Sequence, residues 1–103
     1  KAKIFVVTMP CDNQYREPYN EVIRSVAAKY PGSAYILDIH KYGPDYSDPA
    51  FRTLYFLGGH MNAAGYEFTA WMFMNYIDWI IRHNPTDFAQ AAFIGTDYSW
   101  KKQ

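Results

Sequence analysis

The chain has little cysteine, no excess of either charge and no long uninterrupted apolar run. Cys11 is the one cysteine among 103 residues, so an internal disulfide is excluded, and no cysteine–histidine spacing predicts a zinc site. Ten basic residues balance ten acidic ones, so the basic face that nucleic-acid binding needs is not predicted. Glu67, Asn75 and Asp78 interrupt the most apolar segment, which argues against a membrane span.

The chain also lacks a serine in the setting of a catalytic nucleophile. Ser25 falls within a predicted helix, and the other three lack the strand-to-helix elbow that exposes a nucleophilic hydroxyl (Ser33, Ser47 and Ser99). No cofactor-binding motif is present, and we expect no cofactor. The chain opens at Lys1 without an initiator methionine, so the lack of a visible signal sequence sets no compartment.

What the chain does have is hydrophobic and aromatic side chains in quantity. Hydrophobic residues make up 50% of the sequence and aromatic residues 19%, which is typical of a folded domain with a core. The length allows one small domain at most, over residues 1–103, with residues 84–103 as a short helix and tail.

The hydrophobic pattern of the first half predicts a strand, a helix and a second strand. Continuous apolar runs over Lys3–Met9 and Ala34–Ile39 are typical of strands buried on both faces of a parallel sheet. Between them, Tyr19–Tyr30 has helical periodicity. Its apolar stripe comprises Tyr19, Val22, Ile23, Val26, Ala27 and Tyr30. This order predicts a βαβ unit and an α/β fold.

The second half is predicted to contain a long loop and a long helix. Lys41–Arg52 is rich in turn residues, Thr53–Leu57 suits a short extended segment, and Asn62–Arg82 is a strongly apolar helix. Phe88–Ile94 favours one more short helix, and Gly95 begins a tail. Because two parallel strands do not make a stable sheet, we expect the chain to be the carboxyl-terminal half of a larger α/β domain. The alternatives are a complete small domain, or a homo-oligomer formed through the exposed sheet edge.

The segment from Gly58 to Tyr66 carries the leading candidate for chemistry, His60. Gly58 and Gly59 allow a sharp turn, and Asn62 is a good N-cap for the long helix. A histidine held at the mouth of a rigid element is placed as a general base would be. The alternative is an ordinary turn that happens to contain a histidine.

The predicted sheet suggests which residues surround that histidine. Open α/β sheets bind ligands beyond the carboxyl ends of their strands, so we expect a polar crevice containing Asp12, Asp38, His40 and His60. Asp38, His40 and His60 have side chains that are suitable metal ligands. Cys11 comes directly after a predicted strand, which is a position suited to a nucleophile near His60. Both are weaker hypotheses than an acid–base role for His60, and we expect no metal site.

The order of motifs along the chain resembles the second half of SGNH/GDSL hydrolases. A strand ending in proline comes first, followed by a helix with Tyr-Asn-Glu and by a strand ending in aspartate. A long loop and the pattern Gly-x-His-x-Asn-x-x-Gly-Tyr complete the order. The resemblance extends to about residue 82. His60 matches the family's catalytic histidine, and Asn62, Gly65 and Tyr66 match the positions after it. It implies a three-layer α/β/α, flavodoxin-like domain that is incomplete in this chain.

The same resemblance implies an ester hydrolase whose serine and oxyanion donors lie outside this chain, in an amino-terminal half of the parent protein. His60 would be the general base, and the substrate would be a small ester, such as an acylated carbohydrate. Pocket candidates are Tyr42, Tyr46 and Met61. The family's aspartate falls at Leu57, so Asp45, Asp48, a backbone carbonyl or no group at all takes the orienting role.

A binding module is the alternative from another functional class. The aromatic residues of and beside the long loop would then stack on sugars or pack against a protein partner. They are Tyr42, Tyr46, Phe51 and Tyr55. This interpretation needs no serine, and it gives no role to a histidine beside a double-glycine turn.

Overall fold

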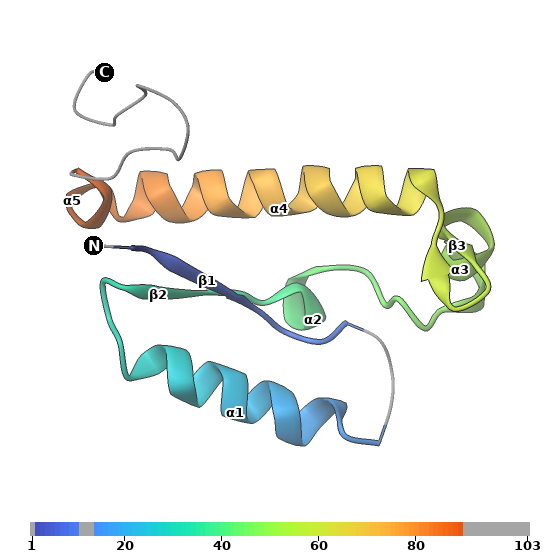
Figure 1. The fold of residues 1–103 in the computed structure, drawn as a ribbon, viewed down its shortest axis with the longest axis horizontal. Helices are drawn as coiled ribbons and strands as arrows, with labels where there is room; N and C mark the ends of the chain where they lie inside the picture. The colour runs from blue at the N-terminus through green and yellow to red at the C-terminus, as the bar shows by residue number, and fades with distance from the viewer. Residues whose placement is uncertain (1, 11–13, 90–103) are drawn as a thin grey trace.

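The structure, a computed structural model, describes residues 2–10 and 14–89. It shows a mixed fold of helices and short strands (Figure 1). The elements are β1 (Ile4–Val7), α1 (Arg16–Ala28), β2 (Ala34–Leu37), α2 (Ile39–Tyr42), α3 (Pro49–Tyr55), β3 (Phe56–Leu57), β4 (His60–Met61), α4 (Ala63–His83) and α5 (Pro85–Phe88). The predicted βαβ order is confirmed, and the mixed fold with its short parallel sheet is compatible with part of an α/β domain.

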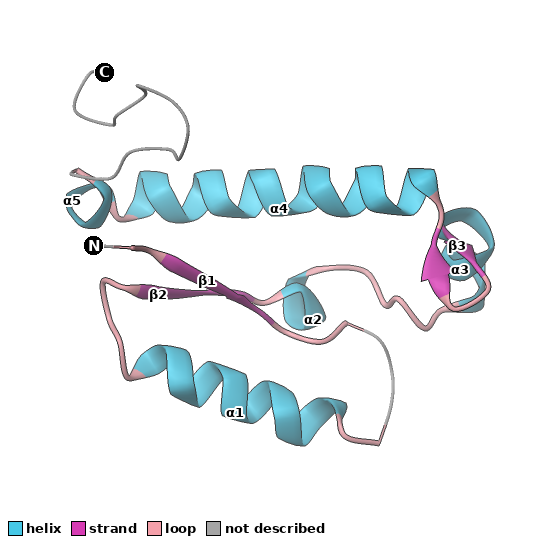
Figure 2. Ribbon diagram, in the orientation of Figure 1, coloured by secondary structure: helices cyan, strands magenta, loops and turns pink. Residues whose placement is uncertain are grey.

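The centre of the fold is a parallel pair of strands, β1 and β2, in which Ile4 lies opposite Ala34 and Val7 opposite Leu37. Figure 1 shows α1 and α4 on opposite sides of this pair, while β3 and β4 form a separate hairpin beyond one end of α4. The buried core, made of Leu37, Ile80 and Phe88, lies between β2 and the last turns of α4. The core therefore lies at the end of α4 away from the hairpin (Figure 2).

The strands are less buried than their sequences predict. The Ile4 side chain is 57% exposed, and the other residues of β1 are only partly buried. In the register of the pair, the Ile4 N–H donates to the carbonyl of Ser33, just before β2, and the Thr8 N–H donates to the Leu37 carbonyl. The backbone groups of Phe5 and Val7 therefore face the other way. Within the described residues no strand pairs with that outer edge of β1.

Helix α1 buries only one edge of its predicted apolar stripe, at Ala27, together with the polar residue Asn20. Asn20 is 0% exposed, and its side-chain amide both accepts from the Met9 N–H and donates to the Met9 carbonyl, at 2.7 and 3.1 Å. Ala27 lies on the same buried face. Satisfied polar pairs thus fix the helix orientation and leave an apolar stripe exposed. The residues of this α1 stripe are Tyr15, Tyr19, Val22, Val26 and Tyr30.

The predicted loop over residues 41–52 is partly helical. Its first residues end α2, whose N-cap Asp38 accepts from the Lys41 N–H at 3.2 Å. Its last residues begin α3, where Asp48 caps the helix and Pro49 occupies the first turn. The extended segment predicted for residues 53–57 is reduced to β3, because α3 continues to Tyr55.

Helix α4 runs from Ala63 to His83 and ends at Asn84-Pro85, as predicted. Pro85 begins α5, which ends at Phe88, the residue at which the predicted helix over residues 88–94 was to begin. Ala89 is the C-cap of α5, and residues 90–94 lie outside the described residues. In the described part of the chain, no helix combines the length and apolar character needed to cross a membrane.

Candidate functional site

His60 lies at the tip of a minimal hairpin. β3 and β4 each contribute two residues, with Leu57 paired to His60 and Phe56 paired to Met61. The turn consists of Gly58 and Gly59, and Gly58 has a φ of 63°. A positive φ at the first central residue is the condition that type II′ hairpin turns place on glycine. The sequence prediction of a sharp glycine turn before the helix is confirmed.

The residues after the hairpin tie it to α3 and α4. The Asn62 side chain accepts from the Gly65 N–H at 2.9 Å as the N-cap of α4, and its amide donates to the Leu54 carbonyl at 2.9 Å. The Asn62 backbone N–H donates to the Tyr55 carbonyl at 2.9 Å. Asn62 therefore joins the end of α3 to the start of α4, two residues from His60.

The His60 side chain is exposed, and the described residues give it no hydrogen-bond partner. Leu57 lies directly across the hairpin and is 79% exposed. Because paired residues point to the same face of a hairpin, a carboxylate at position 57 would lie beside the imidazole, but leucine cannot orient it. Asp45 instead accepts from the Ser47 N–H at 2.8 Å, and Asp48 accepts from the Phe51 N–H at 3.0 Å.

The three pocket candidates lie in two different places. Tyr46 is 2% exposed, and its hydroxyl lies 2.6 Å from that of Thr69. The Thr69 hydroxyl also donates to the Met61 sulfur at 3.3 Å, so this chain of contacts runs beneath the hairpin. Tyr46 therefore presents no surface to a ligand here. Tyr42, by contrast, is exposed on α2.

Phe51 and Tyr55, two of the aromatic residues considered for ligand binding, are half-buried and pack against other rings. The Phe51 ring centroid lies 4.7 Å from that of Tyr55 and 4.8 Å from that of Tyr46, and Phe68 of α4 completes the cluster. These rings hold α3 against α4 and do not form an open stacking platform. Of the four loop aromatics, Tyr42 alone is largely exposed.

A second polar site, the Asp38 cluster, lies where β1 and β2 end. The Asp38 carboxylate accepts from Arg24 at 2.8 and 3.0 Å, from the Thr8 hydroxyl at 3.1 Å and from the Lys41 N–H at 3.2 Å. The hydrogen bonds from Arg24 are the main cause that holds the pKa of Asp38 below its usual 3.8, and burial opposes them. The carboxylate is thus held ionised and fully occupied.

His40 extends this cluster towards α1. Its Nε2 lies 3.0 Å from a Glu17 carboxylate oxygen, its Nδ1 lies 3.3 Å from the Arg24 guanidinium, and its backbone N–H donates to Thr8 at 3.0 Å. A guanidinium only donates, so a hydrogen bond from Arg24 requires the Nδ1 of His40 to accept, and the Nε2 then carries its hydrogen towards Glu17. The structure therefore explains His40 as a tie between helix and sheet.

The predicted crevice of four polar residues does not form as a whole. Asp38 and His40 come together as expected, and Asp12 lies outside the described residues, as does Cys11. His60 lies on the hairpin, away from the ends of β1 and β2 (Figure 1). The prediction failed because the hairpin follows α3, which carries it to the far end of α4. Over residues 2–10 and 14–89, no group of three metal-ligating side chains gathers.

Sequence reasoning missed Thr8, Glu17, Asn20 and Arg24 as members of the Asp38 cluster or its surroundings. A signal was present, because Glu17, Asn20 and Arg24 recur at helical spacing on one face of α1. Hydrophobic periodicity instead predicts that the apolar stripe beside them is the buried face. A polar face can be buried, however, when each of its polar groups has a hydrogen-bond partner.

The Asp38 cluster yields a prediction about stability and pH. Asp38→Asn should lower the free energy of unfolding by about 2 kcal/mol at pH 6, because Arg24 loses its charged partner. The folded pKa of Asp38 is lowered, so its contribution is present above the ordinary value of 3.8 and is lost as the pH falls through the folded value. Thermal unfolding from pH 3 to 7 should therefore show the gap between wild type and variant closing in acid.

Asp78→Asn is the matched control, because Asp78 pairs with Arg82 on the exposed face of α4. Its effect should stay within about 0.5 kcal/mol at every pH. A gap for Asp38→Asn that stays constant or widens below pH 4 would contradict the assignment.

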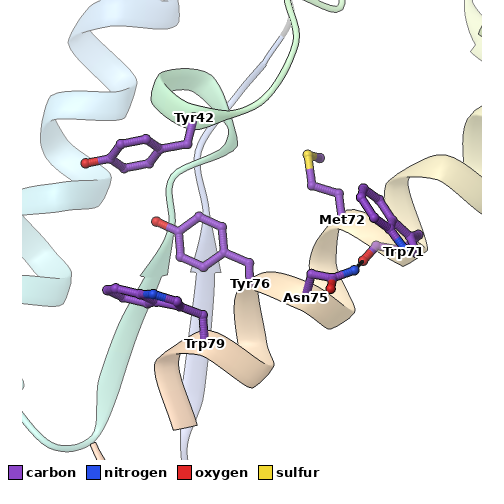
Figure 3. A pocket seen from close by; sticks show the side chains of 6 residues that line it. All are labelled: Tyr42, Trp71, Met72, Asn75, Tyr76 and Trp79. Carbon is purple, nitrogen blue, oxygen red and sulfur yellow. Dashed lines mark hydrogen bonds between the residues drawn. The ribbon is translucent and has the colours of Figure 1, made fainter. Parts of the chain in front are cut away.

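An aromatic groove of about 600 Å³ lies between α2 and α4. Figure 3 shows the rings of Tyr42, Tyr76 and Trp79 gathered on one side of it, with Trp71 and Met72 further along α4. The Tyr42 and Tyr76 rings meet edge to face at 6.4 Å, and burial raises the pKa of the Tyr76 phenol. Asn75 adds an amide to the lining.

No protein-family model, curated protein or solved structure matches the chain.

Proposed function

We propose that this chain is the carboxyl-terminal part of an SGNH/GDSL-type ester hydrolase in which His60 is the general base. The observation that carries the proposal is the mounting of His60. The imidazole is exposed and has no hydrogen-bond partner among the described residues. It lies at the tip of a hairpin that has two residues in each strand and is followed directly by the N-cap of α4. A histidine free to accept a proton, on a turn joined directly to a long helix, is placed as general base catalysis requires.

The outer edge of β1 supports the idea of a larger domain. Phe5 and Val7 direct backbone hydrogen-bonding groups away from β2, and neither has a described partner there. A further parallel strand from an amino-terminal half of the protein would satisfy them and extend the sheet. We propose that the complete domain is of the three-layer, flavodoxin-like kind, with α1 and α4 on the two faces of its sheet.

The proposed reaction is acyl transfer through a serine outside this chain. The serine oxygen attacks the ester carbonyl while His60 removes its proton, and His60 then returns that proton to the departing alcohol. Water repeats the sequence to release the acid and restore the serine. Since Leu57 faces His60, no carboxylate at that position orients the imidazole, and a serine–histidine pair carries the proton.

Fluorophosphonate labelling of the protein from its natural source tests the proposal. We expect a species well above 12.0 kDa that gains the mass of one probe adduct, because the probe reacts with an activated serine. An unlabelled species near 12.0 kDa would refute the serine mechanism.

The aromatic groove favours a second candidate, a non-catalytic carbohydrate-binding module. Trp71, Trp79 and Tyr42 are exposed aromatic residues that line the groove together with Asn75, and this composition suits the stacking and hydrogen bonding of a sugar. Saccharide binding without hydrolysis, unchanged by His60→Ala, would favour this candidate over the hydrolase.

A further inference from the structure

The tip of the His60 hairpin has little support of its own. It contains only two residue pairs, and such a short hairpin is not stable by itself in water. A side-chain carbon placed on Gly58 or Gly59 would meet nothing within 4 Å in the described part of the chain, so none of those residues packs over these two positions. Two adjacent glycines also give the turn more conformational freedom than other residues would.

Arg52 of α3 supplies the support that packing does not. One of its terminal nitrogens donates to the Gly58 carbonyl at 3.0 Å, and the other donates to the Tyr46 carbonyl at 3.3 Å. The guanidinium also lies 4.2 Å from the ring centroid of Phe56, the β3 residue paired with Met61. One side chain therefore joins the loop before α3, the strand β3 and the turn before His60.

The other ties of the hairpin lie at its base. Asn62 and Tyr55 hold the chain after β4, while Arg52 reaches the turn itself. Among the described residues, the Gly58 carbonyl accepts a side-chain hydrogen bond only from Arg52. Loss of this bond would free the turn to move while the core and the base of the hairpin remain intact.

We propose that Arg52 is a positioning residue for His60, holding the hairpin so that the imidazole keeps one orientation. The inference rests on the proposed function, and it adds a residue that does not touch the reacting atoms. A planar guanidinium can bridge two carbonyls while stacked on a ring, whereas an ammonium makes one point contact. Lysine should therefore replace arginine only in part.

The test compares Arg52→Met, Arg52→Lys and His60→Ala in the full-length protein with p-nitrophenyl acetate as the probe. Arg52→Met should lower kcat by about 10- to 100-fold with KM changed by about twofold or less, because misplacement of the base costs turnover more than binding. Arg52→Lys should fall between wild type and Arg52→Met. Amide hydrogen exchange over residues 58–61 should quicken by about tenfold in Arg52→Met.

Arg82→Met is the matched control, since Arg82 is exposed on α4 and pairs with Asp78. It should change neither kcat nor exchange in the hairpin. If Arg52→Met fails to fold, Arg52→Lys alone decides, and wild-type kcat and exchange in it would overturn the inference.

The outcomes separate the two proposals. Loss of activity in His60→Ala, with wild-type kcat and exchange in Arg52→Met, overturns the role of Arg52 and leaves the proposed function standing. Activity retained in His60→Ala overturns the proposed function, and the positioning role of Arg52 in catalysis falls with it.

Discussion

Replacing His60 by alanine in the full-length protein should lower kcat/KM for an aryl acetate by about 10³-fold or more. The expectation follows from the exposed imidazole at the hairpin tip, because no other described histidine lies on that hairpin. Leu57 lies opposite His60 and has no carboxylate to orient it. The loss of kcat/KM should therefore be similar to that seen when a general base that works without an orienting acid is removed. The measurement is steady-state hydrolysis at neutral pH.

His83→Ala is the control for this experiment. His83 is also exposed and lies on the last turn of α4, where its Nδ1 is 2.7 Å from the Trp79 carbonyl oxygen and its ring stacks on Trp79. It should retain full activity. Retention of most activity by His60→Ala would remove His60 from the mechanism.

Gly65→Ala should be the most damaging single methyl addition near the site. A Cβ at this buried position would overlap the Tyr55 carbonyl oxygen and lie 3.0 Å from the Met61 Cβ. Since the first obstacle is backbone, α4 must move away from α3. We expect a loss of about 2–3 kcal/mol in the free energy of unfolding and a fall of about 10 °C or more in Tm. Calorimetry gives the Tm directly.

Gly59→Ala, in the hairpin turn that precedes α4, is the matched control. A Cβ there meets open space, and the φ of Gly59 is not positive, so the change should stay within about 0.5 kcal/mol. If Gly65→Ala were as stable as wild type, the close approach of α4 to Tyr55 would not hold in solution.

Strands β1 and β2, helix α4 and the glycine turn could be predicted from the sequence because their signals are local. The apolar runs gave β1 and β2, and helical periodicity with the Asn62 cap gave α4. The glycine pair gave the turn before His60. Each of these features depends on residues within a few positions of one another, where propensity and capping act.

The features that were mispredicted depend on contacts between distant segments. The sequence predicts a loop and an extended segment where the structure has helix α3, although Asp48-Pro49 is a good helix start. The aromatic cluster that stabilises α3 includes Phe68 of α4, which is distant in the sequence. The buried face of α1 is set by Asn20 on Met9 and Arg24 on Asp38, which no hydrophobic periodicity reveals. The place of His60 relative to Asp38 depended on α3 for the same reason.

The exposed α1 stripe and the open edge of β1 affect how strongly separate copies of the chain associate in solution. Three tyrosines and two valines face solvent along one helix, and the formal net charge is zero near pH 7. With apolar surface uncovered and no net repulsion between molecules, the chain prepared by itself attracts its own copies most strongly at neutral pH. Buffers well to either side of neutrality give it the charge that keeps separate molecules apart.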